Sequence, residues 1–235
     1  MQVFYSTQRS GDFFILNEEE SKHCIRVLRK KEGDQIHLLD GEGGFFLVEI
    51  YEANKHKTTV KIITEEQQGP FPGMQTIIAV APTKNMARLE WFIEKATEIG
   101  IGEFHFFFAQ HSERVKLRMD RLEKVVLSAC KQSLKAKIPS LHEAVSFTDL
   151  IKKYTNFEGQ KYIAHCQKGT QVLLKDTYQR NTPIMILIGP EGDFSPSEIQ
   201  LAIDSGFQEL TLGESRLRTE TAALVACHSI QFLDM

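Results

Sequence analysis

Two segments in the last third of the sequence place glycine beside charged side chains in patterns that suit ligand binding. The first, Ile184–Gly192, is an apolar run that ends in Gly-Pro-Glu-Gly. The second, Leu212–Ala222, begins with Leu-Gly and continues through Arg216 and Arg218. Ligands of open α/β sheets bind beyond the carboxyl ends of the strands, where glycine lets the backbone approach them closely. Two such strand ends, about twenty residues apart, therefore predict one shared pocket.

The two arginines also indicate an anionic partner. Arg216 and Arg218 stand just before a predicted helix, where two cations oppose the positive end of the helix dipole. An anion offsets that placement, and Glu191 or a phosphate group is the candidate. Simpler interpretations stay open here: an exposed helix start for the arginines, and a tight strand-to-helix turn for Gly189–Gly192.

Several other chemistries have no motif in the sequence. His-Glu-x-x-His, Gly-x-Ser-x-Gly, the phosphate-binding Gly-x-x-x-x-Gly-Lys-Ser/Thr and Gly-x-Gly-x-x-Gly are all absent. The eight histidines are scattered without metal-ligand spacing, and the four cysteines lie far apart, so we expect no metal site and no disulfide. His165, at the end of a predicted strand, is the histidine placed to reach the pocket, although a hydrogen-bonded structural role is the simpler reading.

Charge is distributed unevenly along the chain. The net charge of −3 argues against a strongly basic nucleic-acid binder. Between Arg114 and Lys137, however, eight Lys or Arg residues stand against two carboxylates, and a second basic cluster lies at 22–31. Solvated helix faces explain both patches, yet a polyanionic partner stays open. With no apolar run near the roughly 20 residues of a membrane helix and no signal-peptide pattern, we expect a cytoplasmic protein.

The pattern of short apolar runs changes near residue 70. Residues 1–66 contain many short predicted strands and one helix capped by Asn17, which is typical of a small β-barrel. A polar segment with two prolines, 67–73, is the expected linker. In 74–235, strands alternate with amphipathic helices, so we expect an α/β domain with a largely parallel sheet. Ser195-Pro-Ser-Glu198 predicts the start of one of its helices.

These motifs, in this order and spacing, resemble the SPOUT class of S-adenosylmethionine-dependent RNA methyltransferases. The whole chain is similar to the bacterial branch that methylates N3 of a uridine in 16S ribosomal RNA. Further matches lie at His23-x-x-x-Val27-Leu-Arg29, Glu94–Gly100 and Ser112-x-Arg114. The sequence departs from the family pattern at Asp193, where a second glycine usually follows Gly192.

The resemblance implies a fold and a set of binding residues. The implied fold is an N-terminal PUA-like β-barrel that helps to hold RNA, followed by a SPOUT α/β domain with a parallel sheet and a deep trefoil knot. The partners would be 16S ribosomal RNA, within an assembled small subunit, and a second copy of the chain. The residues implied to bind S-adenosyl-L-methionine are His165, Ile188, Gly189, Pro190, Glu191, Gly192, Leu212, Gly213, Leu217 and Arg218. The cations expected to contact RNA phosphates are Lys22, Arg26, Arg29, Lys84, Arg114, Lys116, Arg118 and Arg121.

The reaction implied by this resemblance assigns roles to two further positions. N3 of uracil must lose a proton, which leaves negative charge on the flanking carbonyl oxygens, and a positioned cation stabilises that charge. We assign this role to Arg218, with Glu220 orienting it or helping to remove the proton. No metal is required. N3 lies on the Watson–Crick edge, so a paired target base must be flipped out.

Two alternatives from other classes stay open. One is a non-catalytic RNA-binding or ribosome-assembly factor that has kept the fold and lost the cofactor. The other is a small-molecule enzyme that uses Gly189–Gly192 as a phosphate loop, against which the missing Walker lysine argues.

Overall fold

The computed structural model describes residues 1–71, 73–167, 169 and 171–235, and it divides into two compact units. The first unit is Met1–Pro70 with Leu127–Ile138, and the second is Phe71–Val126 with Pro139–Met235. The expected linker 67–73 includes Pro72, which lies outside the described residues. The boundaries expected from sequence, 1–66 and 74–235, stay a prediction.

The first unit contains a six-stranded mixed sheet among its described residues, in the order β1-β4-β5-β6-β3-β2. Its strands are β1 (Val3–Tyr5), β2 (Arg9–Ser10), β3 (Phe13–Ile15), β4 (Gln35–Leu39), β5 (Gly44–Glu52) and β6 (Thr59–Gln67). β1 pairs parallel with β4, and the other neighbours are antiparallel. Phe14 and Phe46 meet edge to face in the core with ring centroids 4.8 Å apart. The predicted short strands therefore form one curved sheet around an aromatic core.

A helix between β3 and β4 begins where the sequence predicts. The Asn17 side chain accepts a hydrogen bond from the Glu20 N–H at 2.9 Å and so caps α1 (Glu18–Lys22). A π-helical turn, η1 (His23–Val27), continues it. Glu20 is nearly buried, and its carboxylate pairs with Lys131 at 2.6 Å. This ion pair holds a residue of the distant 127–138 segment against the first unit's own helix.

The second unit contains a fully parallel six-stranded sheet in its described part, in the order β12-β10-β11-β7-β8-β9. Its strands are β7 (Thr76–Val80), β8 (Glu103–Phe108), β9 (Ser140–Ser146), β10 (Gln160–Ala164), β11 (Ile184–Ile188) and β12 (Gln208–Leu210). Its helices are α2 (Met86–Ile99), α4 (Phe147–Lys153), α5 (Leu174–Thr177), α6 (Pro196–Asp204) and α7 (Thr219–Asp234), and α3 (Met119–Ser133) starts in it. Every residue of β7 and β11 is buried, as continuous apolar runs in central parallel strands predict.

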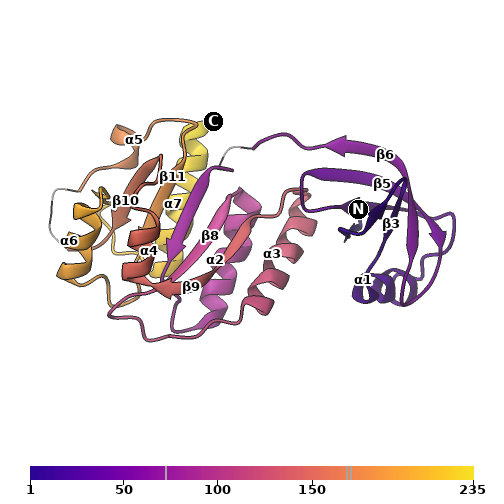
Figure 1. Ribbon diagram of the computed structural model, residues 1–235, viewed down its shortest axis with the longest axis horizontal. Coiled ribbons are helices and arrows are strands. Elements are labelled where there is room, and N and C mark those ends of the chain that lie inside the picture. The colour runs from indigo at the N-terminus through magenta and orange to yellow at the C-terminus, as the bar shows by residue number, and fades with distance from the viewer. Residues whose placement is uncertain (72, 168, 170) are drawn as a thin grey trace. The chain divides into compact units, whose positions relative to one another are not determined.

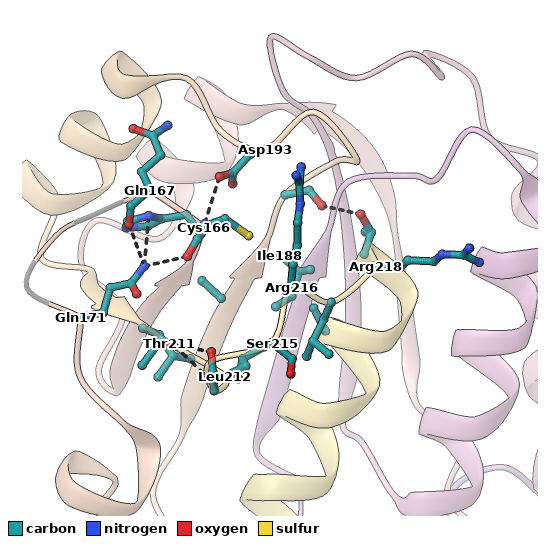
Figure 2. Close-up of a pocket in the computed structure, with 18 of the residues that line it drawn as sticks. Cys166, Gln167, Gln171, Ile188, Asp193, Thr211, Leu212, Ser215, Arg216 and Arg218 are labelled. Atoms are coloured by element: carbon teal, nitrogen blue, oxygen red, sulfur yellow. Dashed lines mark hydrogen bonds between the residues drawn. The ribbon is translucent and has the colours of Figure 1, made fainter.

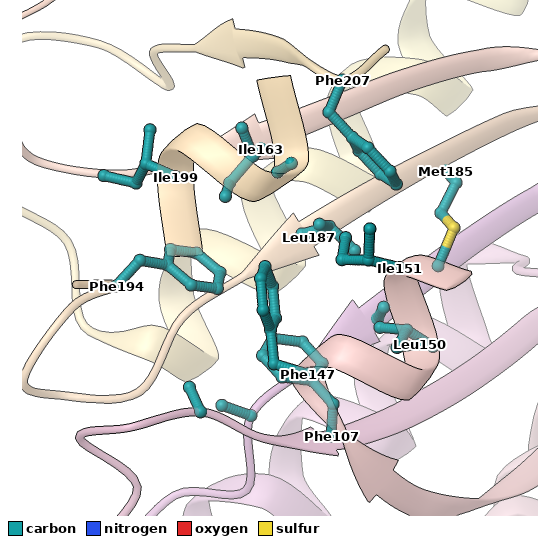
Figure 3. Packing of buried hydrophobic residues seen from close by; sticks show 14 of the residues in the cluster. Phe107, Phe147, Leu150, Ile151, Ile163, Met185, Leu187, Phe194, Ile199 and Phe207 are labelled. Atoms are coloured by element: carbon teal, nitrogen blue, oxygen red, sulfur yellow. The ribbon is translucent and has the colours of Figure 1, made fainter. Parts of the chain in front are cut away.

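Helices cover both faces of this sheet (Figure 1). On one face, α4 and α6 pack against Phe107, Leu187 and Phe194, the centre of the cluster in Figure 3. On the other face, α2 and α7 pack against each other, and Phe92 of α2 meets Phe104 of β8 with ring centroids 5.7 Å apart. The sheet is therefore packed between two layers of helices, which position the ends of its strands.

Local capping fixes the helix ends that the sequence predicts. Ser195 and Glu198 form a complete capping box at the start of α6. α2 ends at Gly100, whose φ of 114° is costly for residues with a Cβ atom. β9 and α5 were not predicted from the sequence. Among the described helices, none is both long and apolar enough to cross a membrane.

Candidate active site

A cavity of about 800 Å³ lies beyond the carboxyl ends of β10, β11 and β12 (Figure 2). Its walls come from the segments that follow these three strands and from the first turn of α7. This volume lies within the range of small-molecule sites, roughly 300–1,000 Å³. The structure therefore brings Ile184–Gly192 and Leu212–Ala222 to one pocket, as the two glycine-bearing strand ends predict.

Nine of the ten residues predicted to bind the cofactor line this cavity. They are His165, Ile188, Gly189, Pro190, Glu191, Leu212, Gly213, Leu217 and Arg218. Gly192 is the exception, because it packs instead against the loop after β8. A Cβ atom at Gly192 would lie 2.8 Å from the Cβ of His111. Glycine at position 192 therefore allows the loop after β11 to pack closely against the loop after β8.

Two contacts fix the turn that follows β11. A Cβ atom at Gly189 would lie 3.0 Å from the ring of Phe194, tighter than ordinary packing. The Thr219 hydroxyl donates to the carbonyl of Gly189 at 3.1 Å. This hydrogen bond connects the first residue of α7, on one side of the cavity, to the turn after β11 on the other side.

Asp193 supplies a second link between the segments around the cavity. Its φ of 63° lies in the left-handed region, which aspartate tolerates better than most residues. One carboxylate oxygen accepts from the N–H of Cys166 at 3.0 Å, and the other accepts from the N–H of Phe194 at 2.9 Å. The carboxylate therefore joins the turn after β11 to the end of β10.

His165 is held by other groups of the protein. Its side chain is almost fully buried, and Nε2 lies 3.1 Å from a carboxylate oxygen of Glu209. The Gln171 amide donates to the His165 carbonyl at 2.6 Å, and the Gln167 amide donates to the carbonyl of Phe194 at 2.7 Å. Gln167 and Gln171 line the cavity but were missed by sequence reasoning, because loop glutamines carry no periodic signal.

The two arginines lie at the rim and differ in direction. Both side chains are exposed; that of Arg216 extends along the cavity opening, whereas that of Arg218 points away from it (Figure 2). Neither has a carboxylate partner within the described part of the chain. Glu191, the partner suggested from sequence, instead accepts the N–H of Lys84 at 3.0 Å. The arginines therefore remain available to a ligand.

Glu220 is buried and does not line the cavity. Its Oε1 lies 3.6 Å from Nε of Arg88, and its Oε2 is buried without a hydrogen-bond partner among the described residues. Glu220 lies buried in the first turn of α7, whereas Arg218 is the N-cap residue, in extended conformation, and its side chain is exposed. The structure does not bring these two predicted catalytic side chains together.

The basic residues of the first unit are only partly paired. Lys22 pairs with Glu18 at 2.7 Å. Arg26 and Arg29 have no carboxylate partner in the residues that the structure describes, and Arg29 has a φ of 55°. These two guanidinium groups are free to contact phosphate.

In the second unit, most of the predicted cations already have partners. Arg114 donates to the carbonyls of Thr83 and Lys84 at 3.1 and 2.7 Å and thus fixes the loop after β7. The other contacts are carboxylate pairs: Lys84–Glu113 at 2.7 Å, Arg118–Asp120 at 2.9 Å and Arg121–Glu90 at 2.8 Å. Hydrogen bonds to these carboxylates raise the pKa of Lys84 and of Arg118. Lys116 is exposed and has no such partner in the described range.

The sequence scan missed a cluster of titratable groups on β8 and β9. Glu103, His105 and His142 hold ligand atoms within 4.8 Å of one another. A hydrogen bond from His105 lowers the pKa of Glu103, and burial lowers the pKa of His105. The sequence signal for this cluster was the Glu-x-His spacing of Glu103 and His105. Their neighbour His142 on β9 can be identified only once the pairing of β8 with β9 is known.

Comparison with known proteins decides the family. The family described as RNA methyltransferase domain matches residues 70–231, and the family described as RNA methyltransferase PUA domain matches residues 16–63. The chain belongs to the RNA methyltransferase family. The resemblance noted from sequence is confirmed, as is the fold class of a PUA-type unit followed by a parallel-sheet α/β unit. The trefoil knot stays a prediction.

Three proteins similar to this methyltransferase match it over nearly the whole length of both chains. It is 32% identical to ribosomal RNA small subunit methyltransferase E of Mesomycoplasma hyopneumoniae, over 95% of this chain and 96% of that protein. A probable rRNA-methyltransferase from Porphyromonas gingivalis has a similar structure, with a TM-score of 0.90, 39% identity and coverage of 100% and 98% of the two chains. The Neisseria gonorrhoeae ribosomal RNA small subunit methyltransferase E, bound to S-adenosyl methionine, has a TM-score of 0.86, 26% identity and coverage of 99% and 98%.

Proposed function

We propose that this methyltransferase transfers a methyl group from S-adenosyl-L-methionine to N3 of a specific uridine in 16S ribosomal RNA. The observation that carries the proposal is the single cavity formed by Ile184–Gly192 and Leu212–Ala222, the two segments that identified the family from sequence. The relatives named small subunit methyltransferase E, one of them with S-adenosyl methionine bound, support it.

The residues of the cavity fit this methyl donor. Ile188–Glu191 and Leu212–Leu217 would hold it through backbone groups, since glycine exposes the peptide at both walls. The N–H groups of Glu214, Ser215 and Leu217 donate to no acceptor in the described residues, so a ligand can accept from them. When bound, S-adenosylmethionine supplies an electrophilic methyl group.

Two side chains near the cavity carry the proposed chemistry. Arg218 is the N-cap residue of α7, and its guanidinium points away from the cavity (Figure 2). We assign it the stabilisation of negative charge on the carbonyl oxygens of a uracil at the rim, together with the helix dipole. Glu220, in the first turn of α7, pairs with Arg88 of α2 and has one carboxylate oxygen without a partner among the described residues. We assign it the positioning of this turn or the acceptance of the N3 proton.

The two basic surfaces would place the RNA. Three cations without a carboxylate partner in the described residues would contact phosphate directly: Arg26 and Arg29 of the first unit and Lys116 of the second. Four others would give up their ion pairs with carboxylates and pair with phosphate instead: Lys22, Lys84, Arg118 and Arg121. We assign residues 1–66 to RNA holding and 74–235 to catalysis within a deep trefoil knot. Because the net charge is only −3, an assembled small subunit in the cytoplasm is the expected substrate.

A second copy of the chain is the other expected partner. α7 buries Ala223, Ala226 and Ile230 within the unit, yet Phe232 near its end is 65% exposed. This exposed ring gives a homodimer an apolar contact next to the end of the chain.

The test is an assay that identifies the modified nucleoside. The purified protein is incubated with tritiated S-adenosylmethionine and small ribosomal subunits from a strain that lacks the matching enzyme, and the RNA is digested to nucleosides. We expect the label in 3-methyluridine, with more from subunits than from free 16S RNA. Label in another nucleoside would contradict N3 as the target. Absence of cofactor binding would contradict the activity itself.

A further inference from the structure

A histidine–carboxylate cluster lies at the edge of the parallel sheet opposite the cavity. Glu103 is the first residue of β8, whereas the cavity lies beyond the carboxyl ends of β10–β12. Glu103 and His105 are two residues apart on one strand and so project from the same face. His142 is the register partner of His105 on β9, the edge strand. The strand pairing therefore gathers three potential ligands on one face.

The two imidazole nitrogens of the cluster contact one carboxylate oxygen. Nε2 of His105 and Nε2 of His142 each lie 2.9 Å from the same oxygen, Oε2 of Glu103. The two imidazole rings stack with centroids 3.8 Å apart and planes 12° apart. Ligand atoms around a tetrahedral zinc ion, with bonds of about 2.0–2.2 Å, lie roughly 3.3–3.6 Å apart, so these atoms must separate by about half an ångström to admit an ion. To bind an ion, the half-exposed ring of His142 must also turn out of the stack, so that both Nε2 lone pairs point at the ion.

The surroundings make one ligand rigid and leave the others accessible. The His105 side chain is only 2% exposed, and the hydroxyl of Tyr154 lies 2.9 Å from its Nε2. The side chains of His142 and Glu103 are 36% and 39% exposed. An ion can thus reach the cluster from solvent and find one ligand already held in place by packing. Lys153 is near enough for its charge to act on His105, and that charge opposes a second cation at the cluster.

We propose that Glu103, His105 and His142 bind one divalent transition-metal ion, with zinc as the expected ion. Two imidazole nitrogens and one carboxylate oxygen suit zinc, whereas magnesium and calcium prefer all-oxygen sites. The ion fastens the edge strand β9 to β8 and takes no part in methyl transfer, because the cluster lies at the other edge of the sheet. Three protein ligands leave a further position for water.

The experiment is a zinc titration of the full-length protein after dialysis against a chelator. Binding is measured by competition with a chromophoric zinc indicator, and we expect one ion per chain. His142→Ala and Glu103→Gln should each weaken binding by at least about tenfold. Both change half-exposed residues, so the fold is kept. The control is His56→Ala, which removes an exposed histidine that contacts a single carboxylate of Glu18 at 3.0 Å.

Further measurements distinguish a metal site from a network of hydrogen bonds that binds no metal. In wild type, Tm should rise as zinc is added, and it should not rise in His142→Ala. Magnesium should have no effect, and S-adenosylmethionine affinity should be the same with and without zinc. The proposal is overturned by the absence of stoichiometric zinc binding, or by equal zinc affinities for wild type and His142→Ala.

Discussion

The carboxylate of Asp193 accepts a hydrogen bond from the backbone N–H of Cys166 at 3.0 Å and so joins the turn after β11 to the end of β10. Asp193 adopts a φ of 63° to do so, a backbone conformation that favours glycine. The side chain thus adds a contact that glycine cannot make, while the backbone keeps a glycine-like conformation. One residue serves both the shape of the turn and the position of the neighbouring loop.

Replacing Asp193 should separate these two contributions. Asp193→Ala loses the hydrogen bond and keeps the strained φ, so it should destabilise the protein by about 1–3 kcal/mol and weaken S-adenosylmethionine binding. Asp193→Gly relieves the strain and should lose less stability, and Asp193→Asn keeps an acceptor and should lose least. Urea unfolding and calorimetric titration measure both effects. If Asp193→Ala and wild type have the same stability and the same S-adenosylmethionine affinity, the hydrogen bond between Asp193 and Cys166 does not position the cavity.

The two rim arginines provide a matched pair for the catalytic assignment. Arg218→Ala should lower kcat by about 10²–10³, because a group that stabilises developing charge is lost. Arg216→Ala removes the same charge from the same rim and should change kcat less. Single-turnover methyl transfer to small subunits, at saturating S-adenosylmethionine, makes the comparison. A larger loss of kcat for Arg216→Ala than for Arg218→Ala would contradict the assignment and would point to Arg216 as the group that stabilises the charge.

Cys166 offers a chemical probe of the cavity. Burial raises the pKa of its thiol and Asp193 raises it further, whereas Arg216 lowers it. Alkylation by iodoacetamide at pH 7.5 should therefore be slower than for a free cysteine and should accelerate as the pH rises. Asp193→Asn should speed the reaction and Arg216→Gln should slow it. S-adenosylmethionine should protect the thiol, since Cys166 lines the cavity.

The other three cysteines serve as internal controls for that labelling. All are buried, and burial raises the pKa of Cys24 to about 11 and that of Cys130 to about 12. Cys227 is likewise buried with a raised pKa. Mass spectrometry of peptides should find the modification at Cys166 first. Faster labelling of a buried cysteine, or no protection of Cys166 by the ligand, would contradict the description of the cavity.

The Arg88–Glu220 pair should couple stability to the start of α7. Glu220 is 8% exposed and Arg88 is 39% exposed, so solvent screens the attraction between them only in part. Arg88→Ala leaves a buried carboxylate without its cation and should destabilise the protein by about 1–3 kcal/mol. Adding Glu220→Gln to this variant should restore part of the loss. A double-mutant cycle of urea unfolding measures the coupling, and additive effects would mean that the pair is not coupled.

Much of the fold was predictable because its signals are local. Asn17 and Ser195 cap helices through hydrogen bonds that span three residues, and Ile184–Ile188 is apolar throughout because it is buried on both faces. β9 was missed because Ser140–Ser146 is polar and largely exposed, so its pairing with β8 depends on the tertiary fold. The same dependence hid the approach of His142 to His105.

The site was predicted unevenly for a similar reason. Glycines and arginines at strand ends identify the cavity walls from sequence, since few other roles require them there. Gln167 and Asp193 were not predicted, because their contacts join loops that are 27 residues apart in the sequence. Gln171 bonds within its own loop, to the carbonyl of His165, and a loop glutamine carries no periodic signal. Glu220 is buried in the first turn of α7 and the side chain of Arg218, the N-cap residue, is exposed, and their two-residue spacing in the sequence did not show this difference.

The most direct test of the account is whether S-adenosylmethionine binds in the cavity at the strand ends. Ala222 lines this cavity in the first turn of α7 and is half-buried, so a larger side chain there can enter the cavity without disturbing the core. Calorimetry should detect one site per chain in wild type and at least about tenfold weaker binding in Ala222→Phe, with Tm unchanged. Unchanged affinity in Ala222→Phe, or no binding to wild type, would contradict the account.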